Sequence, residues 1–182
     1  FEEFWINLVD TPGHSDFSED TYRTITAVDS TIMVIDGAKG VESQTKKLFQ
    51  VCRNRELPII TFCNKMDRES RDIFEIIDEI QEALTIDVTP MTWPVGSGRE
   101  FLGSYDLVNN KLNIMDRADR NVKASTITIN GLNDPIISQH VPKHLLEKLK
   151  QELEMAKGLL PEFDHTMFQS GNMTPLWFGS AI

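Results

Sequence analysis

Apolar residues in the first half of the chain come in short runs that stop abruptly at polar residues. Three such runs occupy residues 4–9, 30–36 and 57–63, and an aspartate or an asparagine ends or follows each of them. A run of this length between turn residues predicts a strand buried on both faces, as in a parallel sheet. The run at 4–9, apolar except for Asn7, is the predicted core strand around which the rest of the chain is organised.

Helical periodicity fills the segments between these runs. We expect helices over 18–27, 43–55 and 72–84, and Ser18 is the predicted N-cap of the first. The third helix places its isoleucine and leucine residues on one stripe: Ile73, Ile76, Ile77, Ile80 and Leu84. Strands that alternate with helices are typical of an α/β fold with a mostly parallel sheet and right-handed crossovers.

The pattern changes after about residue 88. Residues 89–95 predict one more strand, whose prolines favour a place near the edge of the sheet. Short strands at 104–108, 111–115 and 126–129 predict an antiparallel meander, helices are expected at 141–157 and 162–169, and a last strand at 174–178. We therefore divide the chain into a partial core at 1–95, an inserted α+β subdomain at 96–172 and a last core strand at 173–182.

The composition limits the kind of protein. The net charge is −10, from 18 basic and 28 acidic residues, and acidic residues dominate positions 1–36. Such a surface disfavours binding to a nucleic-acid backbone, so we expect no sequence-specific nucleic acid partner. No apolar run approaches the roughly 20 residues that span a bilayer, which predicts no membrane association. The cysteines, Cys52 and Cys63, are expected to be free thiols in a reducing, cytoplasmic compartment.

The first motif with chemical content follows the run at 4–9. Asp10-Thr11-Pro12-Gly13-His14 stands where a parallel sheet presents ligands, at the carboxyl end of a strand. Asp10 is a candidate ligand for a metal or a water, Gly13 allows a phosphate to approach closely, and a histidine at His14 can polarise a water near neutral pH. This pattern is similar to the third nucleotide-binding motif of translational GTPases.

A second motif follows the run at 57–63. Asn64-Lys65-Met66-Asp67 resembles the guanine-reading motif of GTPases. A carboxylate at Asp67 can accept hydrogen bonds from the ring N1–H and the exocyclic amine of guanine, whereas adenine offers no donor at either position. The aliphatic stem of Lys65 can lie along the base while its ammonium stays in water. Together the two motifs predict a guanine-nucleotide site.

Longer segments extend the resemblance over essentially the whole chain. They are residues 10–24, 27–30, 34–42, 64–68, 91–101 and 177–181. On these segments the chain resembles the bacterial peptide chain release factor 3 family of translational GTPases, which is related to elongation factor G. Residues 17–23 and 92–94 favour the release factor over the elongation factor, which shares both motifs. The resemblance implies a P-loop GTPase-type sheet with an inserted subdomain before the fifth nucleotide-binding motif.

The resemblance also implies a function. Proteins of this family bind GTP or GDP with Mg²⁺, hydrolyse GTP, and remove class I release factors from the ribosome after peptide release. The resemblance implies that Asp10 contacts Mg²⁺ through water, that Thr11 and Pro12 contact the nucleotide, and that Gly13 contacts the γ-phosphate. It implies that His14 contacts the attacking water. Guanine would be held by Asn64, Lys65 and Asp67, and its O6 would accept from a backbone amide of Ser180 and Ala181.

Residues 1–182 lack two parts of the family pattern. They contain neither the Gly-x-x-x-x-Gly-Lys-[Ser/Thr] phosphate loop nor the threonine of the first switch, and they do not begin with methionine. We therefore expect a fragment that cannot hydrolyse GTP alone, from an intact protein that does. The alternatives are an elongation-factor-G-like or ribosome-protection GTPase, and a non-catalytic binding module on the same scaffold. Retention of Asp10, Gly13, His14, Asn64 and Asp67 favours truncation over degeneration.

Overall fold

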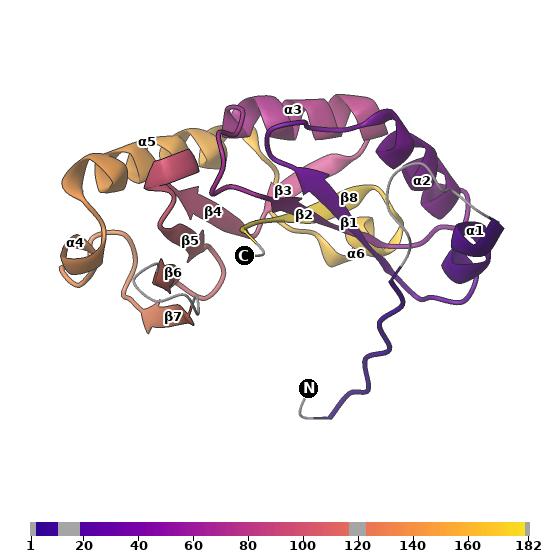
Figure 1. The fold of residues 1–182 in the computed structure, drawn as a ribbon, viewed down its shortest axis with the longest axis horizontal. Helices are drawn as coiled ribbons and strands as arrows, with labels where there is room; N and C mark the ends of the chain where they lie inside the picture. The colour runs from indigo at the N-terminus through magenta and orange to yellow at the C-terminus, as the bar shows by residue number, and fades with distance from the viewer. Residues whose placement is uncertain (1–2, 11–18, 117–122, 181–182) are drawn as a thin grey trace.

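The strands in the described part of this chain form two sheets of different kinds (Figure 1). The computed structural model describes residues 3–10, 19–116 and 123–180. Sheet A has the strand order β1-β2-β8-β3, and every pair in it is parallel. Sheet B has the order β4-β5-β6-β7, and every pair in it is antiparallel. The expected combination of a parallel core and a turn-rich meander is therefore confirmed.

Sheet A is built from segments that lie far apart in the sequence. Its strands are β1 (Thr31–Asp36), β2 (Ile59–Asn64), β3 (Asp87–Pro90) and β8 (Met173–Phe178). The helices that alternate with them are α1 (Glu19–Ile25), α2 (Ser43–Arg53) and α3 (Ile73–Leu84). Figure 1 shows α2 and α3 on one face of the sheet. The helix predicted at 18–27 is shorter than expected, and Ser18 lies outside the described residues.

Helix α3 shows why the sequence folds as predicted. Asp72 caps its first turn, because the carboxylate accepts the backbone N–H of Phe74 at 2.9 Å. Its predicted apolar stripe is buried against sheet A: Ile73, Ile76, Ile77, Ile80 and Leu84. Arg53 of α2 donates to the carbonyls of Leu84 and Thr85 at 3.0 and 2.9 Å, which satisfies acceptors that the end of a helix leaves open.

Sheet B carries its own helical cover. Its strands are β4 (Thr92–Val95), β5 (Gly103–Asp106), β6 (Lys111–Asp116) and β7 (Lys123–Thr128), with the 3₁₀ turn η1 (Gly98–Glu100) between the first two. After it come α4 (Ile137–His140), α5 (Lys143–Leu159) and α6 (His165–Gln169). Leu145, Leu149 and Leu153 of α5 are buried. Figure 1 shows α5 over sheet B and α6 beside β8 of sheet A.

The expectation of a single strand over residues 89–95 is wrong. The chain leaves sheet A after Pro90 and starts sheet B at Thr92, so this segment joins the two sheets. Trp93 is fully buried at the junction, with ring centroids 5.4 Å from Phe74 and 6.1 Å from Phe178. Its indole N–H donates to Glu152 of α5 at 2.8 Å. Trp93, itself in β4 of sheet B, therefore packs against β8 of sheet A and joins it to α3 and α5.

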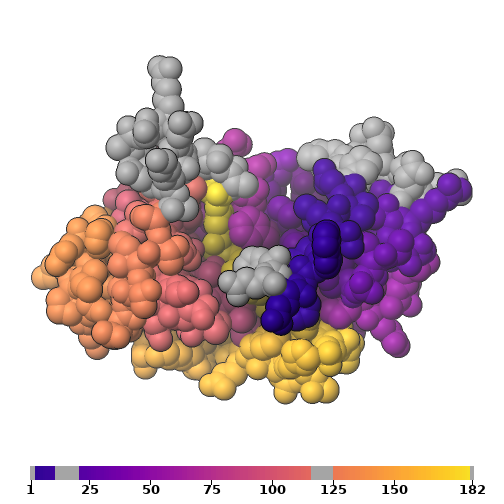
Figure 2. All heavy atoms as spheres, turned by 90° about the horizontal axis from the view of Figure 1, so that it is seen from below, coloured from indigo at the N-terminus to yellow at the C-terminus, as the bar shows by residue number. Residues whose placement is uncertain are grey.

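The expectation of a buried strand at residues 4–9 is also wrong. In the structure this segment has no regular secondary structure, and Trp5, which we expected in the core, is 98% exposed. Figure 2, a view from below, shows these indigo residues on the surface. A strand needs a neighbour for its backbone groups, and residues 4–9 pair with no strand of the described chain. An apolar run alone therefore did not create a strand.

Candidate functional site

Three loops meet at the carboxyl ends of the strands of sheet A. The register pairs Asp36 at the end of β1 with Asn64 at the end of β2, and pairs Cys63 of β2 with Phe178 at the end of β8. Parallel pairing thus brings together residues that are distant in the sequence. Ligands of open α/β sheets bind at this edge. The contacts of these loops therefore define the candidate site.

Backbone hydrogen bonds hold the loop after β2 between its neighbours. The N–H of Gly37 donates to the carbonyl of Asn64 at 2.9 Å, which ties the loop to the end of β1. On the other side, the N–H of Met66 donates to the carbonyl of Gly179 at 3.2 Å, and the N–H of Gly179 donates to that of Cys63 at 3.0 Å. The predicted guanine-reading loop is therefore fixed from both sides.

Lys65 adopts a backbone conformation that is uncommon for a residue with a side chain. Its φ is +66°, in the left-handed region. The N–H of Lys65 donates to the side-chain oxygen of Asn64 at 2.8 Å, which stabilises this turn. Strained backbone of this kind gathers at binding sites, where the surrounding structure holds it in place. The asparagine of the motif thus shapes the loop.

Asp67 is held by a residue from the other end of the chain. The hydroxyl of Ser180, which follows β8, donates to Oδ1 of Asp67 across 113 positions of sequence. From the sequence we expected Ser180 to contact guanine through its backbone, and we did not predict this side-chain hydrogen bond. Asp67 is half-buried. A carboxylate has about four lone-pair sites, so the bond leaves Asp67 able to accept from a ligand.

Asp36 provides another contact at the candidate site that we did not predict from the sequence. Its Oδ1 accepts the N–H of Ala38 at 2.9 Å, a turn cap, and its Oδ2 accepts from the ammonium of Lys65 at 2.6 Å. Partial burial opposes ionisation of Asp36, but the hydrogen bonds from Lys65 and Ala38 and the charge of Lys65 outweigh it and lower the pKa of this carboxyl. The sequence motifs taken one at a time do not reveal this pair, because Asp36 ends β1 and Lys65 follows β2.

The residues beneath the candidate site are densely packed. A Cβ on Gly179 would lie 2.9 Å from the ring of Phe62, and one on Gly37 would lie 3.0 Å from the sulfur of Met66. Cys63 is completely buried beneath them, and burial together with the charge of Asp36 raises the pKa of its thiol to about 12. Only glycine fits at residues 37 and 179 without moving these neighbours.

Most of the other predicted site residues fall outside the described part of the chain. Thr11, Pro12, Gly13, His14 and Ala181 lie outside the described residues, so their roles stay predictions. Asp10 is described and exposed. In the described part of the chain, no group of three or more His, Cys, Asp or Glu side chains could hold a metal ion. Because Mg²⁺ in nucleotide sites takes one or two carboxylates and completes its shell with phosphate oxygens and water, a single carboxylate at Asp10 still fits this chemistry.

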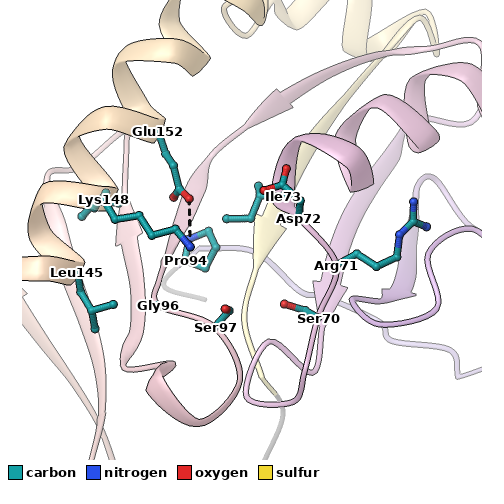
Figure 3. A pocket seen from close by; sticks show the side chains of 11 residues that line it. Ser70, Arg71, Asp72, Ile73, Pro94, Gly96, Ser97, Leu145, Lys148 and Glu152 are labelled. Atoms are coloured by element: carbon teal, nitrogen blue, oxygen red, sulfur yellow. Dashed lines mark ion pairs between the residues drawn. The ribbon is translucent and has the colours of Figure 1, made fainter.

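A separate cavity of about 250 Å³ lies between α3, β4 and α5 (Figure 3). Its polar lining includes Ser70, Ser97, Lys148 and Glu152, and the ammonium of Lys148 is 3.6 Å from the carboxylate of Glu152. None of the predicted site residues lines this cavity. The candidate site is therefore the group of loops at the ends of β1, β2 and β8.

Comparison with known proteins decides the family. The family model described as the elongation factor Tu GTP binding domain matches residues 1–182. The chain belongs to this family. The predicted guanine-reading motif of this chain lies where the loops converge at the ends of β1, β2 and β8. Within the described residues, no helix is both long and apolar enough to cross a membrane.

Relatives refine the resemblance found in the sequence. The chain is 56% identical over 179 residues to peptide chain release factor 3 of Nitrosomonas europaea, and 54% identical over 181 residues to that of Nitrosomonas eutropha. Each match covers 97% of this chain and 33% of the relative, so the chain spans about a third of the length of these proteins. The resemblance to release factor 3 is therefore confirmed.

A solved structure supports the fold. A protein from Thermus thermophilus matches with a TM-score of 0.64 and 19% sequence identity, over 94% of this chain and 26% of that protein. Similarity at this level of identity shows the fold alone. The α/β fold of this family, with its additional antiparallel sheet, is confirmed.

Proposed function

We propose that this chain is the guanine-binding part of a translation termination factor. The intact protein would bind GTP or GDP with Mg²⁺, hydrolyse GTP on the ribosome in the cytoplasm, and promote the dissociation of class I release factors. Two relatives that are named peptide chain release factor 3 support this proposal, at 54–56% identity over 97% of the chain.

The observation that carries the proposal is the contact between Ser180 and Asp67. It fixes a half-buried carboxylate at the sheet edge where ligands bind, beside a loop held on both sides. Guanine would donate its N1–H and its exocyclic amine to Asp67, and the stem of Lys65 would lie along the ring. Adenine would leave this carboxylate without a donor, which disfavours ATP strongly.

The remaining roles follow the family pattern and belong to the intact protein. Asp10 would hold the Mg²⁺ shell through water, Gly13 would donate its N–H to the γ-phosphate, and His14 would orient the attacking water when the ribosome engages. Bound Mg²⁺ supplies charge neutralisation at the phosphates. Residues 1–182 contain no phosphate loop sequence, so we propose that they do not hydrolyse GTP by themselves.

Calorimetric titration of GDP with Mg²⁺ tests this proposal, first with the full-length protein and then with residues 1–182. We expect binding to the full-length protein that GTP competes and ATP does not. Competition by ATP, or no binding, would contradict the proposal. For residues 1–182 we expect no detectable heat although circular dichroism shows a folded chain. Micromolar binding by the short chain would mean that the loops described above suffice without a phosphate loop.

An elongation-factor-G-like or ribosome-protection GTPase is the second candidate, because it shares both nucleotide motifs. A release assay separates the two. A termination factor accelerates the exit of class I release factors from ribosomes after peptide release. The alternative proteins show ribosome-stimulated hydrolysis without this effect.

A further inference from the structure

The two carboxylate oxygens of Asp36 have different partners. Oδ1 accepts the N–H of Ala38 at 2.9 Å, and this bond fixes the orientation of the carboxylate at the end of β1. Oδ2 accepts from Lys65 at 2.6 Å. The carboxylate is therefore anchored to its own turn by one oxygen and holds the ammonium of Lys65 at a defined place with the other.

Lys65 is consequently fixed at both ends. Its backbone N–H is bonded to Asn64, which holds the left-handed conformation, and its ammonium is held by Asp36. A lysine side chain has one of the largest rotamer entropies of any residue. Ordering this side chain before a ligand arrives removes part of that cost from the binding step.

We propose that Asp36 is a positioning residue for guanine recognition: it holds the ammonium of Lys65 so that the lysine stem forms a preordered wall of the base site. This inference rests on the proposed function and assigns Asp36 a role in it. Asp36 touches no ligand in this scheme and acts through Lys65. The lysine side chain is 41% exposed and that of Asp36 is 18% exposed, so solvent screens the pair and its effect on affinity is moderate.

Asp36→Asn in the full-length protein is the decisive variant. The amide oxygen of asparagine can still accept the N–H of Ala38, so the turn is preserved while the charge that holds Lys65 is lost. We expect the Kd for GDP to rise about fivefold to tenfold at low salt, and less at high salt, because an exposed pair is screened. In a Lys65→Met background, the same substitution should have no further effect on the Kd.

Asp106→Asn is the matched control. Asp106 also ends a strand and accepts the N–H two residues later, at 2.9 Å, but it lies in sheet B away from the candidate site. We expect its Kd for GDP to equal that of the wild type. A purely structural role of Asp36 would predict the same loss in the Lys65→Met background as in the wild type, and this result would overturn the inference.

The outcomes also separate this inference from the proposed function. If the wild-type protein does not bind GDP selectively, the proposed function fails. If the wild type binds GDP and Lys65→Met weakens binding, but Asp36→Asn binds as the wild type does, only the inference about Asp36 fails. Weaker binding of Asp36→Asn that disappears in the Lys65→Met background supports both.

Discussion

Asp36 in sheet A and Asp106 in sheet B use the same local chemistry with different results. Each carboxylate accepts the backbone N–H two residues later, at 2.9 Å. The second oxygen of Asp106 accepts from Asn109, three positions away in its own turn, at 2.9 Å. The second oxygen of Asp36 accepts from Lys65, 29 positions away in the loop that follows β2. The same kind of turn cap therefore contacts a distant loop in sheet A and only its own turn in sheet B.

The difference follows from how the two sheets connect their strands. Neighbours in an antiparallel meander are joined by short turns, so the contacts at a strand end come from nearby residues. Parallel neighbours need long crossovers, and their carboxyl ends meet at one edge although they are distant in sequence. The bond from Ser180 to Asp67 shows this at 113 positions of separation. Sheet A thus brings together groups that are distant in the sequence, whereas the turn after β5 of sheet B makes its contacts locally.

The substitution with the largest expected effect on this distinction is Asp67→Asn in the full-length protein. An amide at this position presents a donor toward the amine of guanine, so we expect GDP affinity to fall on the order of 10⁴-fold. Xanthosine diphosphate should bind better than GDP, because its 2-oxo group can accept from the amide. Competition titrations with both nucleotides measure this exchange. Unchanged preference for GDP would refute a base-reading role for Asp67.

Thiol labelling tests the packing beneath the same site. A pKa of about 12 for Cys63, against 9.0 ordinarily, lowers its thiolate fraction at pH 8 by about 10³-fold. In a Cys52→Ser variant, alkylation of the native protein should be slower by at least this factor than alkylation in urea. Because the folded-state pKa is raised, the thiol stabilises the fold below pH 9 and this contribution is lost between pH 9 and about 12. Rapid labelling of the native protein at pH 8 contradicts the buried position.

Trp93→Ala tests the junction between the sheets. The side chain is fully buried, so we expect the free energy of unfolding to fall by about 3–5 kcal/mol. Urea denaturation measures this change. Trp5→Ala is the control with the same substitution, because that side chain is 98% exposed and should cost less than about 0.5 kcal/mol. Equal effects of the two substitutions would mean that residues 4–9 are buried.

His14→Ala tests the chemical step assigned to the first motif. We expect GDP affinity to stay at the wild-type value and ribosome-stimulated GTP turnover to fall on the order of 10²-fold, because His14 would orient the water and not the base. Turnover assays with purified ribosomes measure the rate. Turnover at the wild-type rate would remove His14 from the proposed mechanism.

The smallest expected effect concerns α5, which covers sheet B. Gly158 lies inside this helix, and a Cβ there would meet nothing within 4 Å. Gly158→Ala should therefore stabilise the fold by about 0.5–1 kcal/mol, because alanine loses less backbone entropy on folding. Thermal unfolding measures the change, and nucleotide affinity should stay constant. Lower stability would indicate a contact that residues 3–10, 19–116 and 123–180 do not show.

Local sequence patterns predicted most helices and strands correctly, and they failed where pairing with another strand decides the structure. The stripe on α3 and the alternation around it predicted the helix and its buried face correctly. The run at 4–9 has the same strand-like composition as β2, yet it is exposed because no described strand pairs with it. The two strands at 87–95 could not be separated from the sequence, because only Met91 lies between them and only their pairing with β8 or β5 distinguishes them.

The sequence by itself determined the motif at residues 64–67, its place after a strand, and the family to which the chain belongs. Only the tertiary structure decided which side chains support that motif. Asp36 and Ser180 are ordinary turn residues in sequence, and they become partners of Lys65 and Asp67 because parallel pairing of β1, β2 and β8 brings their loops together. Hydrogen-bond partners across strands depend on register, and register is a property of the assembled sheet.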